Sequence, residues 1–248
     1  MATININGIR CYYQLQGEGD AVVLLHGWGQ NTEMMQFIQD HLSNRFQVLN
    51  LDFPGFGQSE QPPVAWGVSD YAQFLEQLLN KLNISSPILI AHSFGCRVAF
   101  HYAAKKGASK MVLTGAAGLR GKETKVRMKT KVYKRVSSLL KLMGAEKTQE
   151  KLKSVMGSAD YRQATGVMRD TLVKVVNDDV SDLLDKIDCP TFLFWGKEDD
   201  ATPLWMGQEM EKRMKNAGLA VVENEGHYAY FYQPQQFCRA LDSFLGGK

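Results

Sequence analysis

The chain has 248 residues, of which 44% are hydrophobic, 10% aromatic and 22% charged. These proportions are ordinary for a soluble globular protein and exclude a disordered, collagen-like or coiled-coil chain. The formal net charge of +3 is too small to indicate a nucleic-acid-binding protein. The longest apolar run, 87–104, is interrupted by polar and charged side chains, whereas a membrane-spanning helix needs roughly 18 apolar residues, so we expect no membrane span.

The amino-terminal residues and the four cysteines bear on where the protein resides. The first ten residues carry neither a basic start nor an apolar segment, so no secretion signal is expected. Cys11, Cys96, Cys189 and Cys238 are far apart and form no C-x-x-C pair, which argues against a zinc site and against a disulfide framework. Reduced thiols in a cytoplasmic protein without metal or cofactor are the simplest interpretation.

Predicted strands and helices alternate over the first 114 residues. Alternating apolar and polar residues at 3–7 and 9–15 flank Asn7-Gly8, a sequence typical of a β-hairpin. Further strands are expected at 21–25, 46–51, 87–91 and 110–113, and helices at 31–42 (capped by Asn31 or Thr32), 69–82 (capped by Ser69) and 94–105. Such alternation of strands with helices predicts a mostly parallel sheet with helices on both faces.

The alternation stops between about 118 and 186. This segment is rich in Lys, Met and Leu and has helical patterning without a convincing strand. Strands then follow at 191–195 and 219–222, with helices at 203–216 and 234–245. We therefore expect one α/β core domain, 1–117 and 187–248, interrupted by an inserted helical cap at 118–186.

Ser93 is the candidate nucleophile. It lies where a predicted buried strand meets a helix, which is the context of a nucleophile elbow. In an elbow a tight turn lifts the serine hydroxyl above the sheet, and small residues flank it; the usual pattern G-x-S-x-G has Ala91 in its first position here. A serine that only caps the helix is the alternative, and the succession of strand, turn and helix favours the nucleophile.

A serine hydroxyl needs a base, usually a histidine oriented by a carboxylate. His227 follows the last predicted strand on a glycine-containing turn and is the candidate base. His92 adjoins the serine, but it is not expected to reach the serine hydroxyl, because successive side chains of a strand point to opposite faces. His41 and His101 lie within predicted helices and are interpreted as structural, and His26 belongs to a separate loop.

The carboxylate is expected in the loop 196–203, because α/β folds gather their ligands at the carboxyl ends of the strands. Glu198, Asp199 and Asp200 are the candidates there. With any of them, the chain order serine, acid, histidine is that of the α/β-hydrolases and not that of chymotrypsin or subtilisin.

On these residues the chain resembles the α/β-hydrolase superfamily, and within it the compact esterases that include the pimeloyl-ACP methyl ester esterases. The family's W-G-x-x-D-x-x-x-P loop matches Gly196, Asp199 and Pro203, which implies that Asp199 is the acid. The segment 52–59 matches the family's D-x-P-G-x-G-x-S turn, which we interpret as structural.

The resemblance also implies an oxyanion hole. Residues 25–29, Leu-His-Gly-Trp-Gly, resemble the family's oxyanion loop. The implied donors are the backbone N–H groups of Trp28 and Phe94, with His26 bracing the loop through hydrogen bonds. Two such donors stabilise the tetrahedral intermediate by roughly 3 kcal/mol each.

The expected activity is therefore hydrolysis of carboxylic esters by a carboxylesterase-type serine hydrolase, through an acyl-enzyme intermediate. Aromatic side chains near the expected pocket and methionines in the cap favour a small to medium apolar acyl group, although ordinary cap packing would explain the methionines as well. The expected pocket residues are Trp28, Phe94, Tyr228, Met128 and Met168.

Other reactions of the same fold stay open, because fold does not determine reaction. The superfamily includes thioesterases, lyases and C–C hydrolases with the same triad. Arg97, one turn into the elbow helix, resembles an arginine of the menaquinone-pathway lyases. A lyase that acts on an anionic substrate therefore remains an alternative. A third class is a ligand receptor that retains a slow hydrolase pocket.

The basic segment 119–153 carries 12 Lys and Arg against 3 Glu. The resemblance to carrier-dependent esterases implies an acidic carrier protein as a partner of this segment. Its lysines spread around more than one helix face, which favours a solvated helix over a docking surface; they include Lys122, Lys125, Lys129, Lys131 and Lys134.

Overall fold

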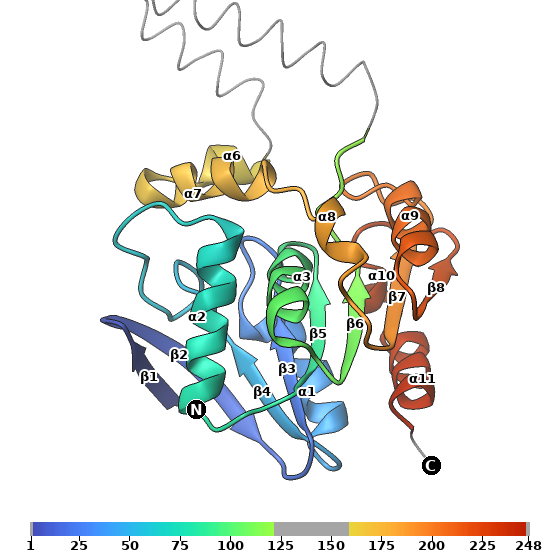
Figure 1. Cartoon of the computed structure of the whole chain (residues 1–248), viewed down its shortest axis with the longest axis horizontal. Helices are drawn as coiled ribbons and strands as arrows, with labels where there is room; N and C mark the ends of the chain where they lie inside the picture. The colour runs from blue at the N-terminus through green and yellow to red at the C-terminus, as the bar shows by residue number, and fades with distance from the viewer. Residues whose placement is uncertain (1, 122–158, 247–248) are drawn as a thin grey trace, which may run out of the picture.

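The computed structural model describes residues 2–121 and 159–246 (Figure 1). Most of the expected cap therefore lies outside the described residues. Met128 and the five lysines named above belong to that part of the chain, so the expectations about them stay predictions, as do the domain boundaries at 117 and 186.

The described residues form one sheet of eight strands, in the order β1-β2-β4-β3-β5-β6-β7-β8. β1 pairs with β2 and β2 with β4 in antiparallel fashion, and all other neighbours are parallel. The predicted mostly parallel sheet is confirmed. The strands are β1 Ala2–Ile6, β2 Ile9–Gln16, β3 Ala21–Leu25, β4 Gln47–Leu51, β5 Ile88–His92, β6 Lys110–Thr114, β7 Thr191–Gly196 and β8 Ala217–Val222.

The predicted hairpin joins β1 and β2. Asn7 and Gly8 both have positive φ, 51° and 85°, as a two-residue turn between right-twisted strands requires. The asparagine and glycine at these positions tolerate that conformation.

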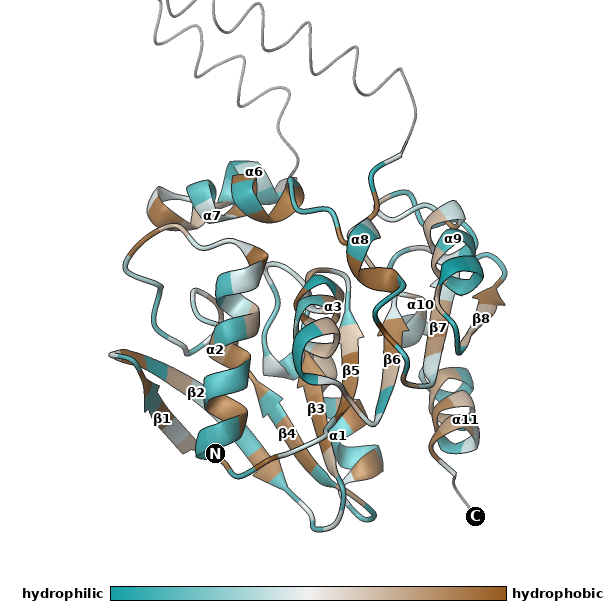
Figure 2. Ribbon diagram, viewed as in Figure 1, coloured by the Kyte–Doolittle hydropathy of each residue, from teal (hydrophilic) through white to brown (hydrophobic). Residues whose placement is uncertain are grey.

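Helices cover both faces of the sheet (Figure 1). One face carries α2 (Val68–Lys81), α3 (Phe94–Lys106), α8 (Ser181–Leu184) and α9 (Trp205–Arg213), and the other carries α1 (Gln36–Leu42), α10 (Ala229–Tyr232) and α11 (Pro234–Leu245). Apolar residues therefore make up all of β3 and all of β5 except its last residue, His92, as the brown of these two strands in Figure 2 shows. In β5, for example, Leu89 packs into one core and Ile90 into the other.

One predicted helix cap is confirmed and another is wrong. The first helix begins as a 3₁₀ turn, η1 (Thr32–Met35), and Asn31 is its cap, because its side chain accepts a hydrogen bond from the Glu33 N–H at 2.9 Å. The prediction of Ser69 as cap of α2 is wrong: the helix begins at Val68, and Gly67 is the N-cap. The Gly67 N–H donates to the Asp70 carboxylate at 2.7 Å, so the acid of the first turn satisfies this donor.

Two differences lie near the carboxyl terminus. α9 ends at Arg213, short of the predicted 216, and α10 is an additional single turn. A turn of four residues is too short for a periodic apolar pattern, so sequence patterning could not indicate it.

α6 (Ala159–Gln163) and α7 (Gly166–Val176) lie across the end of the molecule toward which the parallel strands point (Figure 1). Backbone and side-chain contacts join α7 to the loop before α2. The Trp66 N–H donates to Thr171 Oγ1 at 3.1 Å, and Lys174 Nζ donates to the Ala65 carbonyl at 2.6 Å. α7 therefore forms a wall above the carboxyl ends of the strands. Among the helices within 2–121 and 159–246, none combines the length and apolar character needed to cross a membrane.

The turn at 52–59 is held by its first residue. Asp52 Oδ2 accepts a hydrogen bond from the Gln58 N–H, and Oδ1 accepts one from the Thr32 N–H, both at 2.7 Å. Its carboxylate is buried within the turn, which agrees with a structural role for this motif.

Candidate active site

Ser93 lies in a strained turn between β5 and α3. Its backbone has φ 49° and ψ −107°, a combination that a residue with a side chain rarely adopts. The first turn of α3 approaches the end of β3 so closely that a Cβ on Gly95 would lie 2.2 Å from the Leu25 carbonyl oxygen. Only glycine fits there, and this geometry is that of a nucleophile elbow.

Ser93 is hydrogen-bonded to His227, which is in turn bonded to Asp199. His227 Nε2 lies 2.9 Å from Ser93 Oγ, and His227 Nδ1 lies 2.8 Å from Asp199 Oδ2. The three residues come from the ends of β5, β7 and β8, which meet at one edge of the sheet. The structure thus brings together the three residues expected to form a triad.

Asp199 is the acid that the fold buries. Its side chain has no exposed surface, whereas the neighbouring Glu198 and Asp200 are exposed. Asp199 Oδ1 accepts hydrogen bonds from the N–H groups of Ala201 and Thr202 at 2.9 and 2.8 Å. Oδ2 accepts one from Thr202 Oγ1 at 2.7 Å, besides its contact with His227. Such donors stabilise the ionised carboxylate.

Two residues that sequence reasoning missed complete this arrangement. Gly115 follows β6 with φ 48°, and a Cβ there would lie 2.9 Å from His227 Nδ1 and 3.2 Å from Asp199 Oδ2. A side chain would therefore separate the acid from the histidine. A glycine directly after a predicted buried strand was the only signal in the sequence, and Thr202 offered none beyond its place in the acid loop.

The predicted oxyanion loop passes beside Ser93. Trp28 and Phe94 contact each other edge to face, with ring centroids 5.5 Å apart. The loop is closed by Gln30, whose Oε1 accepts a hydrogen bond from the Gly27 N–H at 2.9 Å. Within the described residues, neither Trp28 nor Phe94 donates its backbone N–H to another group.

His26 braces this loop, as the resemblance implied. Its Nε2 accepts a hydrogen bond from the Phe53 N–H at 3.0 Å, so Nδ1 carries the proton and donates to the Gly27 carbonyl at 2.7 Å. Burial lowers the pKa of His26 to about 4. The ring is therefore neutral near pH 7 and serves as a hydrogen-bonding strut.

His92 lies behind His227 and does not contact the serine hydroxyl. Its Nδ1 lies 3.1 and 3.0 Å from the carbonyl and hydroxyl oxygens of Thr114, and its ring centroid is 4.7 Å from that of His227. The pKa of His92 is held well below its usual value, mainly by burial and to a smaller extent by the charge of the neighbouring His227. A neutral His92 thus fills the space behind the candidate base.

A cavity of about 360 Å³ opens onto Ser93 and His227. Trp28, Phe94 and Tyr228 line it, as predicted. Met168 does not: it is 6% exposed and packs onto Gly55. α7 contributes apolar side chains to the lining, and polar side chains come from α3, α6 and the loops after the strands. The other described lining residues include Leu172, Val175, Val176, Arg97, Asp160, Asp200, Ala201 and Thr202.

Arg97 is the basic residue of this lining. It lies one turn into α3, and its Nη1 donates to the Asp178 carbonyl at 2.5 Å. Burial lowers the pKa of the Arg97 guanidinium, and the carboxylates of Asp178 and Asp179 oppose that shift. The cavity is therefore apolar toward Trp28 and α7 and basic toward α3.

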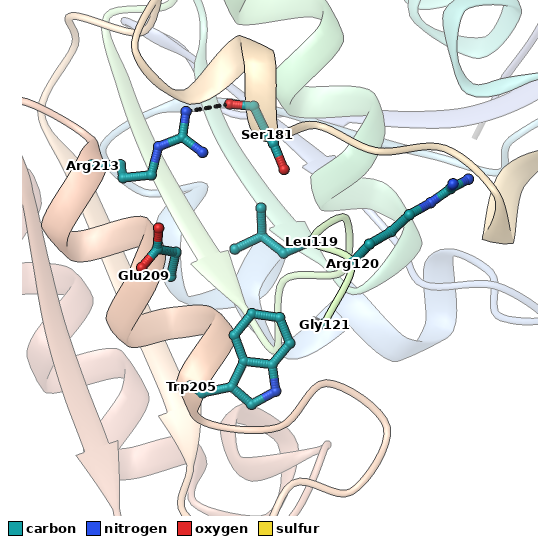
Figure 3. A pocket seen from close by; sticks show the side chains of 7 residues that line it. All are labelled: Leu119, Arg120, Gly121, Ser181, Trp205, Glu209 and Arg213. Carbon is teal, nitrogen blue, oxygen red and sulfur yellow. Dashed lines mark hydrogen bonds between the residues drawn. The ribbon is translucent and has the colours of Figure 1, made fainter. Parts of the chain in front are cut away.

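A second hollow, of about 420 Å³, lies beyond the loop that follows β6 (Figure 3). Trp205, Glu209 and Arg213 of α9 face Leu119 across it, and Arg213 donates to the Ser181 carbonyl at 2.7 Å. Its described lining includes no histidine beside a nucleophile, so the Ser93 cavity is the candidate active site.

Comparison with known proteins agrees with this fold. The family model described as "alpha/beta hydrolase fold" matches residues 20–234. A pimeloyl-[acyl-carrier protein] methyl ester esterase of Vibrio vulnificus is 24% identical over 95% of this chain and 98% of its own length. A 2-hydroxy-6-oxononadienedioate/2-hydroxy-6-oxononatrienedioate hydrolase of Burkholderia vietnamiensis is 29% identical over 96% and 91%.

Solved structures show the same fold. An esterase from Exiguobacterium antarcticum superposes with a TM-score of 0.75 at 24% identity, covering 98% of this chain and 97% of the other. The fold and the arrangement at the sheet edge define an α/β-hydrolase. The chain belongs to the alpha/beta hydrolase fold family, and we class it with the hydrolase enzymes of that superfamily.

Proposed function

We propose that this protein is a serine hydrolase that cleaves carboxylic esters with a small to medium apolar acyl group. The observation that carries the proposal is the continuous hydrogen-bonded path from Ser93 Oγ through both ring nitrogens of His227 to Asp199. A serine hydroxyl has little nucleophilicity by itself, and this path supplies the base and its orienting acid.

In the proposed reaction, Ser93 Oγ attacks the ester carbonyl while His227 Nε2 accepts the hydroxyl proton. His227 returns that proton to the alcohol as the C–O bond breaks, which leaves an acyl-serine. Water, deprotonated by the same nitrogen, then attacks the acyl carbonyl; the bond to Ser93 Oγ breaks as His227 returns the proton to that oxygen, and the acid is released. Asp199 stays ionised, holds the Nδ1–H in place and stabilises the imidazolium. The triad and water complete this cycle without a metal or a redox cofactor.

The backbone N–H groups of Trp28 and Phe94 are the proposed oxyanion donors. Both flank the elbow and are left without an acceptor in the described part of the chain. Phe94 is the first residue of α3, where N–H groups have no partner within the helix. Two such donors would stabilise the developing alkoxide by roughly 3 kcal/mol each.

The apolar part of the cavity supports an apolar acyl group. Trp28 and Phe94 form one side, and Leu172, Val175 and Val176 of α7 form another. A volume of about 360 Å³ suits a small to medium substrate. The esterase names of the Vibrio and Exiguobacterium proteins add support for this class of reaction.

Arg97 favours a second candidate function, hydrolysis of a substrate that carries a carboxylate. Its guanidinium lines the cavity and donates to a backbone carbonyl, while the nearby carboxylates of Asp178 and Asp179 favour its charged form, which suits an anionic group of the substrate. The Burkholderia relative is named for cleavage of a dioate. A carrier-linked ester is a further possibility, since the Vibrio relative is named for one, but the basic segment expected to bind the carrier lies largely outside the described residues.

The nucleophile is tested with a fluorophosphonate and with p-nitrophenyl butyrate. Wild-type protein should be labelled and should hydrolyse the ester. Ser93→Ala should remain folded, lose labelling and lose at least about 10³-fold in kcat, because the covalent step requires this hydroxyl. Labelling that survives the substitution would reject Ser93.

The same comparison identifies the substrate class. Neutral acyl esters of increasing chain length, an acyl-carrier methyl ester and a dienedioate are given to both proteins. We expect the highest Ser93-dependent kcat/KM with short neutral esters. A preference for the dioate that is lost in Arg97→Leu would favour the second candidate, and a preference for the carrier ester would favour the carrier-dependent one.

A further inference from the structure

The Thr202 hydroxyl lies between the acid and the base of the site. Thr202 Oγ1 is 2.7 Å from Asp199 Oδ2 and 3.2 Å from His227 Nδ1. Thr202 is only 4% exposed, so water does not compete for its hydroxyl. Asp199 Oδ2 therefore has two side-chain partners where the basic triad arrangement needs one.

The backbone fixes this hydroxyl in place. The Thr202 N–H donates to Asp199 Oδ1 at 2.8 Å, and the Thr202 carbonyl accepts from Trp195 Nε1 at 2.7 Å. Trp195 is fully buried in β7. The threonine is consequently held through both its backbone N–H and its carbonyl, and its side chain does not need to be ordered by substrate.

The direction of each hydrogen bond follows from the chemistry of the partners. His227 Nδ1 carries a proton when Nε2 is free to accept one from Ser93, so Nδ1 cannot accept a hydrogen bond from threonine. The Thr202 hydroxyl proton therefore goes to Asp199 Oδ2, and a hydroxyl lone pair faces the His227 N–H. The carboxylate oxygen that orients His227 is shared between two donors.

We propose that Thr202 is a positioning residue of the triad, whose hydroxyl shares Asp199 Oδ2 with His227 and thereby sets the pH range over which His227 stays a neutral base. This inference rests on the proposed hydrolase function. A donor that binds a carboxylate disperses part of its negative charge, which weakens the attraction of the carboxylate for a protonated imidazole. This bond to Asp199, at 2.7 Å, outweighs the opposing contact of the hydroxyl lone pair with the His227 N–H at 3.2 Å. Without the hydroxyl, Asp199 would favour imidazolium more strongly, and His227 would become protonated at a higher pH.

The other charged or titratable groups around His227 are left unchanged by a substitution at Thr202. His92 and Tyr228 have ring centroids 4.7 and 5.3 Å from that of His227. The cavity wall adds Arg97, Asp160 and Asp200. Because these groups act equally in every Thr202 variant, a difference between the variants reports the hydroxyl.

The test compares Thr202→Val, which replaces the hydroxyl by a methyl group, with Thr202→Ser, which keeps it. The readout is the pH midpoint of the acidic limb of kcat/KM for p-nitrophenyl butyrate. Thr202→Val should raise this midpoint by about 0.5 pH unit or more, and Thr202→Ser should leave it within about 0.2 of wild type. Thr202→Ala should behave like the valine variant and serves as the second variant if Thr202→Val is poorly folded.

A second measurement does not depend on turnover. The pH titration of the His227 ring is followed by NMR in wild type and in each variant, and the same upward shift is expected when the hydroxyl is absent. An unchanged or lowered midpoint in a folded valine or alanine variant would overturn the role of Thr202. If the proposed hydrolase function itself is wrong, the wild-type protein will show no Ser93-dependent hydrolysis. The two failures are therefore distinguishable.

Discussion

At the scale of single residues, the site depends on positions where a side chain is either strained or forbidden. Ser93 accepts a positive φ so that its hydroxyl stands above the sheet. Gly95 and Gly115 are glycines because a Cβ would strike the Leu25 carbonyl in one case and His227 in the other. The proposed chemistry thus requires three backbone positions as much as it requires reactive groups.

The choice of acid can be tested at this scale. Asp199→Asn should lower kcat/KM by about 10³-fold or more, because an amide would hold His227 in the wrong tautomer and could not stabilise the imidazolium. Asp200→Asn is the matched control: this neighbour lines the cavity but is exposed, and no hydrogen bond joins it to His227, so kcat/KM should stay within about threefold of wild type. A larger loss at Asp200 would transfer the role to that residue.

At the scale of elements, α7 is a wall of the cavity that several parts of the core hold in place. Met168 packs on Gly55, and Thr171 binds the Trp66 N–H. Two residues beyond its carboxyl end, the Asp178 carbonyl accepts a hydrogen bond from Arg97, and the Asp178 carboxylate lies 3.1 Å from His101 Nε2. Arg97 and His101 are four residues apart, so they lie on one face of α3 and fasten the segment together.

The packing of α7 predicts the effect of truncating its buried side chain. Met168→Ala removes a side chain that is 6% exposed and should lower the free energy of unfolding by about 2 kcal/mol, as typical for a buried methionine. Val173→Ala, in the same helix but 44% exposed, should change it by less than about 0.5 kcal/mol. Urea denaturation of both variants measures the difference. Equal effects would show that Met168 contributes no core packing.

At the scale of the whole molecule, the sheet separates two hydrophobic cores and buries two histidines between them and the site. His26 and His92 are both without exposed surface. Burial holds the pKa of each below its ordinary value, to about 4 for His26. Both rings are therefore neutral in the native protein at pH values where an unfolded chain would protonate them.

This burial predicts a loss of stability in mild acid. Between pH 7.5 and 5 the unfolded His26 takes up a proton near pH 6.5, whereas the native His26 does not until about pH 4. The unfolded state binds more protons, so the free energy of unfolding falls as the pH falls, by about 2 kcal/mol from this residue alone.

Urea denaturation at pH 7.5 and 5 checks the contribution. The drop in the free energy of unfolding should be smaller by about 2 kcal/mol in His26→Gln than in wild type. Above pH 5 most carboxylates stay ionised in both states, so they contribute little to the comparison. An equal drop in both proteins would show that His26 titrates alike when folded and unfolded.

The sequence by itself determined the alternation of strands and helices, the hairpin at Asn7-Gly8, the strand-to-helix position of Ser93 and the late position of His227. These features follow from local patterns, since apolar periodicity and turn residues act over a few neighbouring positions. The resemblance of the acid loop and the oxyanion loop to a known family added Asp199, Trp28 and Phe94.

The tertiary structure decided what depends on segments far apart in the chain. It buried Asp199 rather than its two neighbours, required glycine at Gly115, placed the Thr202 hydroxyl on the acid and turned Met168 toward Gly55 instead of the cavity. The loops after β5, β6, β7 and β8 meet only when the parallel strands align, so distances between their side chains are set by long-range packing. Local periodicity carries no information about such distances.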